Sequence, residues 1–135
     1  MIAVSKIEVL LVEDNAGDAL LVQQIAAECA VPVRIHIALD GQQALEMLSA
    51  SYLKLDLIIL DLNIPKISGL VFLERYRGRE VPIVVFSSSE NPVEINRALA
   101  LGAREFVRKP LDFESFSEAV HTMIDKWTPA GCDGR

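Results

Sequence analysis

One short stretch constrains the fold more than any other: an apolar run that ends in an acid. Residues Leu57–Leu60 are all apolar, as is typical of a strand buried on both faces of a parallel sheet. Asp61 comes where that strand ends, and Pro65 follows closely. A carboxylate at the carboxyl end of a parallel strand lies where open α/β sheets bind their ligands. Taken alone, Asp61 could equally be a turn residue, so the rest of the chain has to decide.

The composition excludes several classes of protein. With 135 residues, of which 51% are hydrophobic and 24% charged, we expect one compact domain. A net charge of -6 disfavours contact with a phosphate backbone, so we predict no nucleic-acid partner. No apolar run is long enough to span a membrane and the N-terminus lacks signal-peptide features, so we predict no membrane contact and a cytoplasmic location. Cys29 and Cys132 have no metal or redox spacing, and we interpret them as a small helix residue and a free thiol in the tail.

Strands and helices are expected to alternate along the chain. Apolar or alternating runs predict further strands at residues 7–12, 33–37, 81–86 and 105–107, and His36 in the second of these is predicted to be solvated. A helix should follow each strand, with starting signals near Asp18, Asp40-Gly41, Gly69, Asn91-Pro92 and Asp112. The last helix should bury a face made of Phe113, Phe116, Val120, Ile124 and Trp127.

This alternation predicts an α/β fold with a five-stranded parallel sheet, doubly wound by five helices that cover both faces. We expect the domain to occupy residues 1–128 and residues 129–135 to form a flexible C-terminal tail.

Polar residues follow four of the predicted strands. Glu13 and Asp14 follow the first strand, Asp61 the third, Ser87 the fourth and Lys109 the fifth. Because the carboxyl ends of parallel strands meet at one edge of the sheet, these five side chains should lie close together. Each has a common structural role by itself, as a turn residue, a helix cap or a solvated lysine, but five at one edge is a pattern that chance rarely produces.

The chemistry that needs this set is transfer of a phosphoryl group to a carboxylate. Clustered acids repel one another unless a cation neutralises them, and Mg²⁺ prefers oxygen ligands of this kind. Asp61 could then attack phosphorus as a nucleophile, while a metal ion and Lys109 stabilise the charge and the Ser87 hydroxyl bonds a phosphoryl oxygen.

The sequence resembles the receiver domain of two-component response regulators. The resemblance extends over nearly the whole chain, in the motifs Leu11–Asn15, Asp40–Leu45, Leu60–Pro65 with Gly69, Val85–Ser88, and Gly102-Ala103 followed by Lys109-Pro110. It implies the flavodoxin-like fold of the chemotaxis regulator with strand order 2-1-3-4-5, and this order comes from the family and not from the sequence pattern.

The resemblance also implies a role for each site residue. Asp61 would accept the phosphoryl group from a sensor histidine kinase, and Lys109 would pair with that group. Mg²⁺ would be bound by Asp14, Asp61 and the backbone carbonyl of Asn63, with Glu13 acting mainly through water. No other cofactor is expected.

Two residues would form the switch. Ser87 would swing toward the phosphoryl group and Phe106 would turn inward in the active state, and the Lys109-Pro110 bond is often cis in the family. The chain departs from the common family pattern at both positions. Phe106 lacks the hydroxyl of the frequent tyrosine, and Ser87 replaces the commoner threonine.

Narrower features resemble single-domain regulators that are paired with bacterial phytochrome kinases. They are Asp14–Asp18, Asn63–Lys66, Pro110–Phe116 and Trp127. We expect no output domain after the fifth helix, so the signal should pass through a protein contact to a downstream protein or phosphotransfer partner. A homodimer through the fourth helix, the fifth strand and the fifth helix is the corresponding hypothesis, with Val93, Leu99 and Phe106 on that face.

Three other functions share part of the pattern. A small phosphohydrolase with an aspartate nucleophile usually has a second Asp two residues later, where this chain has Asn63. A flavin-binding module needs a Ser/Thr/Gly-rich phosphate loop in place of Glu13-Asp14. A receiver-like interaction module that works without phosphorylation should lack Asp14, Asp61 or Lys109, and all three are present. We therefore predict that the protein is not an enzyme, apart from supporting the phosphorylation and dephosphorylation of its own aspartate.

Overall fold

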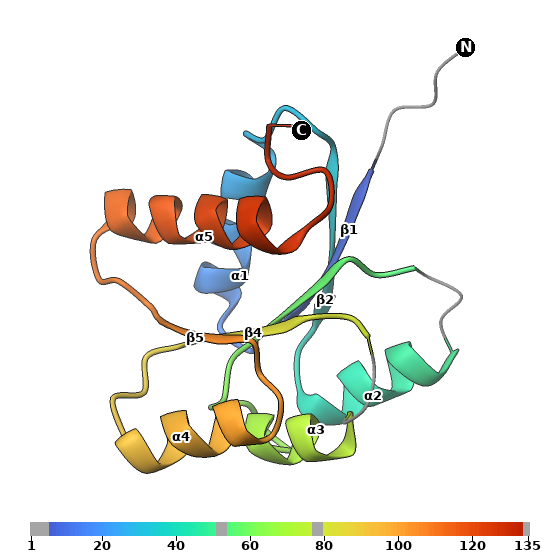
Figure 1. Ribbon diagram of the computed structural model, residues 1–135, viewed down its shortest axis with the longest axis vertical. Helices are drawn as coiled ribbons and strands as arrows, with labels where there is room; N and C mark the ends of the chain where they lie inside the picture. Colours follow the sequence, from blue (N-terminus) through green and yellow to red (C-terminus); the bar gives the residue numbers. More distant parts are fainter. Residues whose placement is uncertain (1–5, 51–53, 77–79, 134–135) are drawn as a thin grey trace.

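A computed structural model describes residues 6–50, 54–76 and 80–133. Its five parallel strands form one sheet in the order β2-β1-β3-β4-β5 (Figure 1), which confirms the predicted fold. The strands are β1 (Ile7–Val12), β2 (Val33–Ala38), β3 (Leu57–Leu60), β4 (Ile83–Ser87) and β5 (Glu105–Arg108).

A helix follows each strand. The helices are α1 (Ala16–Ala26), α2 (Gly41–Ala50), α3 (Gly69–Arg75), α4 (Pro92–Ala100) and α5 (Phe113–Trp127). A polar side chain caps each of them by accepting a backbone N–H in the first turn, and these caps are Asn15, Asp40, Ser68, Asn91 and Asp112. The α1 helix thus begins before Asp18, whose N–H bonds Asn15 at 2.9 Å. Gly102 ends α4 with a φ of 110°, a conformation that glycine adopts at little cost.

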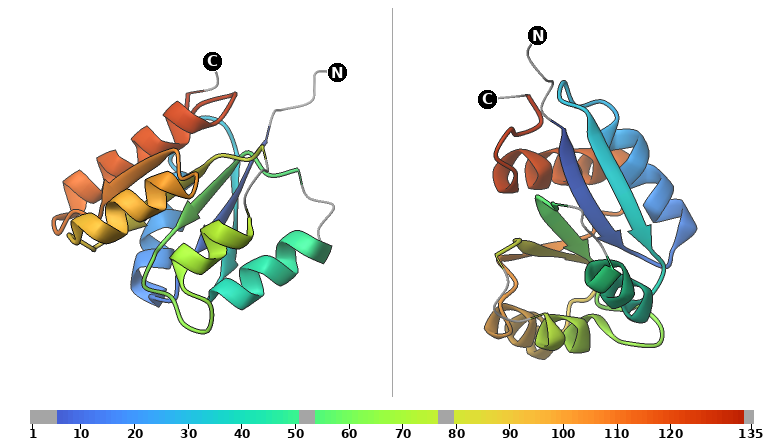
Figure 2. Two further views of the ribbon diagram at one scale, coloured as in Figure 1. Left: turned by 60° about the horizontal axis from the view of Figure 1, so that its bottom comes forward. Right: turned by 90° about the vertical axis from the view of Figure 1, so that its right-hand side faces the viewer.

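The helices divide into two layers, one on each face of the sheet. The α1 and α5 helices cover one face, and α2, α3 and α4 cover the other (Figures 1 and 2). Successive residues of β1 alternate between the two cores, so that Leu11 packs with α1 and α5 while Leu10 packs on the opposite face. Burial on both faces explains why β1, β3 and β4 read as nearly unbroken apolar runs.

The last helix differs from its prediction at its first residue. Phe116, Val120 and Ile124 are buried as expected, but Phe113 is 60% exposed. Helical spacing shows which residues share a face but not how far along the helix the core extends, and Phe113 stands in the first turn, beside the loop after β5.

The prediction of a solvated His36 is also wrong. Its Nε2 atom lies 2.7 Å from a Glu8 carboxylate oxygen, and both side chains are less than one fifth exposed. Parallel pairing of β1 with β2 places Glu8 opposite Arg34, two residues before His36 on the same face of the sheet.

The structure corrects the interpretation of Cys29 as a small helix residue and of Cys132 as a tail thiol. Cys29 and Cys132 form a disulfide across 103 residues of sequence. Residues 129–133 fold back after α5 where a free tail was expected, Cys132 is buried, and its carbonyl accepts the Ala30 N–H at 2.9 Å. The remaining tail residues 134–135 lie outside the described part of the chain. Sequence spacing could not pair these cysteines, because only the packing of α1 against α5 brings them together.

Within the described residues, no helix combines the length and the hydrophobicity that crossing a bilayer requires.

Candidate phosphoryl-acceptor site

Strand register places the predicted site residues at one edge of the sheet. Val12 pairs with Leu60, and the Asp61 N–H donates to the Val12 carbonyl at 3.0 Å, so Glu13 and Asp61 leave adjacent strands side by side. Where β4 pairs with β5, the Lys109 N–H donates to the Ser87 carbonyl at 2.9 Å. All of the residues that the sequence placed at strand ends therefore meet at the carboxyl edge of the sheet, as predicted.

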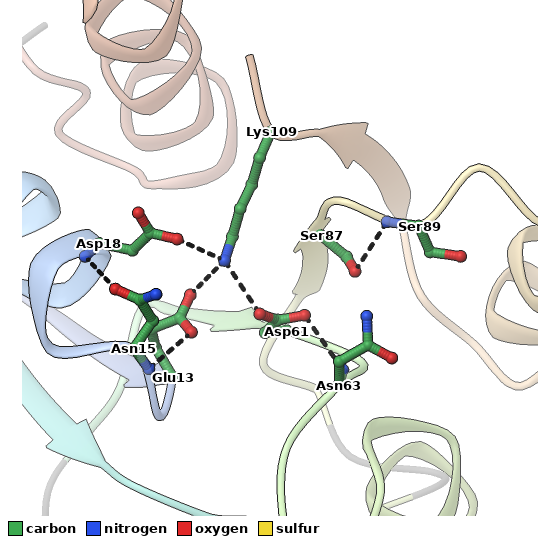
Figure 3. Close-up of polar contacts among 8 residues, drawn as sticks. All are labelled: Glu13, Asn15, Asp18, Asp61, Asn63, Ser87, Ser89 and Lys109. Atoms are coloured by element: carbon green, nitrogen blue, oxygen red, sulfur yellow. Dashed lines mark hydrogen bonds and ion pairs between the residues drawn. The ribbon is translucent and has the colours of Figure 1, made fainter. Parts of the chain in front are cut away.

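Lys109 is the centre of an ion-pair cluster (Figure 3). Its Nζ atom lies 2.6 Å from Glu13 Oε1, 2.9 Å from Asp18 Oδ2 and 2.9 Å from Asp61 Oδ2. The lysine, Glu13 and Asp61 are all buried. The contact with Asp18 was not predicted, because the two residues are separated by 91 positions and Asp18 looked like a helix-start residue.

Burial and charge act in opposite directions on this cluster. Burial raises the pKa of Glu13 to about 7, against the opposing effect of its bond to Lys109. Burial also disfavours the charge on Lys109, but the three carboxylates outweigh it and hold the lysine pKa above its usual value. Lys109 therefore keeps its charge at neutral pH, while burial makes Glu13 easier to protonate than an exposed glutamate.

Both oxygens of the Asp61 carboxylate have partners. Oδ2 accepts from Lys109, and Oδ1 accepts the Asn63 N–H at 3.1 Å. Carboxylate oxygens of Glu13, Asp14 and Asp61 lie within 4.8 Å of one another, and Asp14 is exposed while the other two are buried. This set of hard oxygen donors fits a divalent cation such as Mg²⁺. The hydrogen bond between Asn63 and Asp61 comes from the backbone N–H of Asn63. The role of the Asn63 backbone carbonyl as a Mg²⁺ ligand therefore stays a prediction.

The predicted switch residues lie next to this cluster. Ser87 is fully buried, and its Oγ accepts the Ser89 N–H at 3.3 Å. The Ser89 hydroxyl in turn donates to Glu94 on α4 at 2.6 Å, which ties the loop after β4 to that helix. Phe106 is partly buried against the core beneath α4.

Two further features surround Lys109. The described residues contain no cis peptide bond, so Lys109-Pro110 is trans here, although this bond is often cis in the family. Proline permits both isomers. A cleft of about 310 Å³ opens beside the site and is lined by Asp18, Ser88, Lys109 and Phe113, among others. Lys109 thus lies between the acid cluster and an open cleft.

Comparison with known proteins finds a family and individual proteins that this chain is similar to. Residues 9–121 match the response regulator receiver domain. The two-component response regulator ARR16 of Arabidopsis thaliana is 34% identical over 120 residues, which cover 78% of this chain and 73% of that protein.

Two solved structures are similar throughout. The phosphorylated cyanobacterial phytochrome response regulator RcpA is 29% identical, with a TM-score of 0.86 over 91% of this chain and 94% of that one. The Mn²⁺-bound form of response regulator Rcp1 is 25% identical, with a TM-score of 0.83 over 90% of this chain and 94% of that one.

Proposed function

We propose, because this chain belongs to the response regulator receiver domain family, that it accepts a phosphoryl group on Asp61 from a histidine kinase and answers with a change in a protein-binding face. Receiver domains are signalling modules, not enzymes with an external substrate. The observation that carries the proposal is the buried Asp61 carboxylate, 2.9 Å from the Lys109 ammonium, at the carboxyl edge of a parallel sheet.

The chemistry follows from these positions. An Asp61 oxygen forms a bond to phosphorus as the bond from phosphorus to the histidine nitrogen of the kinase breaks, which leaves an acyl phosphate on Asp61 and a free imidazole. Lys109 is already within hydrogen-bonding distance of Asp61, so its ammonium can pair with the negative oxygens of the incoming phosphoryl group. Asp18 and Glu13 hold the same ammonium from the other side and fix its position.

A divalent cation completes the proposed site. Asp14, Asp61 and the Asn63 carbonyl would bind Mg²⁺ directly, and Glu13 would act through water. When bound, the cation neutralises the clustered carboxylates and the charge of the phosphoryl group. The similarity of this chain to the Mn²⁺-bound form of Rcp1 supports the assignment of a divalent cation.

The response would pass through the loop after β4. Ser87 lies at the end of β4, and a swing of its hydroxyl toward the phosphoryl group would break its bond to Ser89. The Ser89–Glu94 bond links the same loop to α4, so α4 and Phe106 beside it would shift together. Val93 and Leu99 on α4 are 74% and 42% exposed, which favours a contact face, such as a homodimer through α4, β5 and α5.

A phytochrome-type kinase is the partner that we infer for this receiver. The similarity to the phytochrome response regulator RcpA and to the bacteriophytochrome response regulator AtBRR, which is 30% identical with a TM-score of 0.69 over 86% of this chain and 91% of that one, supports this inference. Transfer of radiolabelled phosphate from such a kinase, in preference to an unrelated histidine kinase, would support the pairing. Equal or slower transfer from the phytochrome kinase would refute it.

The phosphoacceptor assignment is tested by intact mass after incubation with acetyl phosphate and Mg²⁺. We expect one phosphoryl adduct that requires Mg²⁺, is absent in Asp61→Asn and persists in the control Asp133→Asn, which changes an exposed acid of the tail. No adduct on the folded wild-type chain would refute the proposal and favour an interaction module that works without phosphorylation. The molar mass of wild type and of Leu99→Asp, measured by light scattering with and without acetyl phosphate, tests the proposed homodimer separately.

A further inference from the structure

Three metal-ligating side chains meet at the opposite edge of the sheet from Asp61. Cys29 lies just after α1, His121 on α5, and Cys132 in the segment that follows α5. That segment lies beside the α1–β2 loop, near the amino end of β1 (Figures 1 and 2). The two sulfurs and a ring nitrogen of His121 lie within 4.8 Å of one another. The cluster therefore has no part in the acceptor site.

The orientation of His121 is the informative observation. Its Nδ1 atom lies 3.2 Å from Cys132 Sγ, and its Nε2 atom lies 3.3 Å from a Glu28 carboxylate oxygen. With the proton on Nε2 bonded to Glu28, the Nδ1 lone pair points at a sulfur that has no proton to donate while the disulfide is closed. A metal-bound histidine has this same arrangement, with one nitrogen on the metal and the other N–H on a carboxylate.

The surroundings also suit a metal ion. A cleft of about 270 Å³ adjoins the cluster, and Asp125 and Asp133 line it together with His121 and Cys132. Zinc sites need ligand atoms roughly 3.5 to 4 Å apart around bonds of about 2.0 to 2.3 Å. Two thiolates and one imidazole supply three of the four positions, and the cleft has room for a water or a carboxylate as the fourth.

We propose that Cys29, His121 and Cys132 form a redox-controlled zinc site: the reduced cysteines bind Zn²⁺ together with His121, and the oxidised cysteines form the disulfide seen here. A low-molecular-weight disulfide of the glutathione type is the oxidant. It takes two electrons from the two thiolates, one S–S bond forms between the cysteines, the S–S bond of the oxidant breaks to give two thiolates, and Zn²⁺ leaves. In both states the segment 129–133 stays attached to the end of α1.

The plain alternative is a structural disulfide beside an uninvolved histidine. The zinc site and the structural disulfide predict different behaviour of the reduced chain, because only a three-residue site binds a thiophilic cation with both sulfurs and the imidazole. Co²⁺ is the suitable probe, since thiolate coordination produces a charge-transfer band in the near ultraviolet and tetrahedral coordination produces intense visible bands.

The experiment uses the full chain, reduced with a phosphine without oxygen, in excess Mg²⁺ to fill the acidic site. We expect one Co²⁺ per chain with both sets of bands, and displacement by one Zn²⁺. The bands should be absent in the oxidised wild-type chain and in Cys132→Ser. The affinity for Co²⁺ should fall at least tenfold in His121→Ala. It should stay unchanged in His36→Gln, which alters the other histidine of the chain.

Two results would overturn the proposal. One is a reduced wild-type chain without thiolate bands, and the other is binding that His121→Ala leaves unchanged. The oxidised wild-type chain serves as a control of identical sequence, so a misfolded variant cannot obscure the answer. Addition of glutathione disulfide to the zinc form should then release one Zn²⁺ for each protein disulfide formed, and oxidation without release would refute the redox part.

Discussion

Replacement of Lys109 by methionine tests the electrostatic account of the site. The side chain of Lys109 is 7% exposed and contacts three carboxylates at 2.6 to 2.9 Å, and those of Glu13 and Asp61 are 3% and 9% exposed. Methionine keeps the apolar stem but leaves these acids without their cation. Loss of one partner from a buried ion pair typically costs about 3 to 5 kcal/mol, so we expect the free energy of unfolding to fall by about 3 kcal/mol at pH 7 without metal.

Two conditions should reduce this loss. Lowering the pH below about 7 protonates Glu13, because burial raises the pKa of this carboxyl group to about 7. The difference in free energy of unfolding between Lys109→Met and wild type should then shrink, since an uncharged Glu13 no longer needs the ammonium. Excess Mg²⁺ should also reduce the difference, because the cation neutralises the same oxygens.

Urea unfolding with a chelator present measures the effect, and Lys126→Met provides the matched control. Lys126 is 54% exposed and lies 3.4 Å from Glu105, so its removal should change stability by less than about 0.5 kcal/mol. The reasoning would be refuted if Lys109→Met unfolded at the same urea concentration as Lys126→Met.

Three further predictions concern the packing and the disulfide that hold the fold together. Phe72→Ala removes a fully buried ring and should lower the free energy of unfolding by about 3 to 5 kcal/mol in urea titrations, and a loss below about 1 kcal/mol would contradict the packing described. In Gly69→Ala the new Cβ would come within 2.6 Å of Leu62 Cα and 2.8 Å of the Asp61 carbonyl, so both stability and the rate of phosphorylation by acetyl phosphate should fall; an unchanged rate would show that the loop relaxes freely. Cys29→Ser should lower stability by about 2 to 4 kcal/mol under oxidising conditions, because it opens a loop of 103 residues, and should match wild type when both contain reductant and chelator.

Much of the fold could be predicted from the order of residues along the chain. The unbroken apolar run Leu57–Leu60 indicates burial on both faces, and the alternation of such runs with capped helices indicates a parallel sheet. Since the carboxyl ends of parallel strands meet at one edge, the proximity of Glu13, Asp61 and Lys109 followed from where each stands relative to its strand. These are local properties of the chain, joined by one rule of topology.

Contacts between distant segments depend on distances that no local pattern encodes. The bond from Lys109 to Asp18 depends on the angle at which α1 leaves the sheet. The pairing of Glu8 with His36 depends on the register of β1 against β2. The disulfide between Cys29 and Cys132 requires that α5 pack against α1 and that the chain then turn back. Sequence periodicity determines which face of an element is buried, and only tertiary packing decides which polar groups then lie within bonding distance.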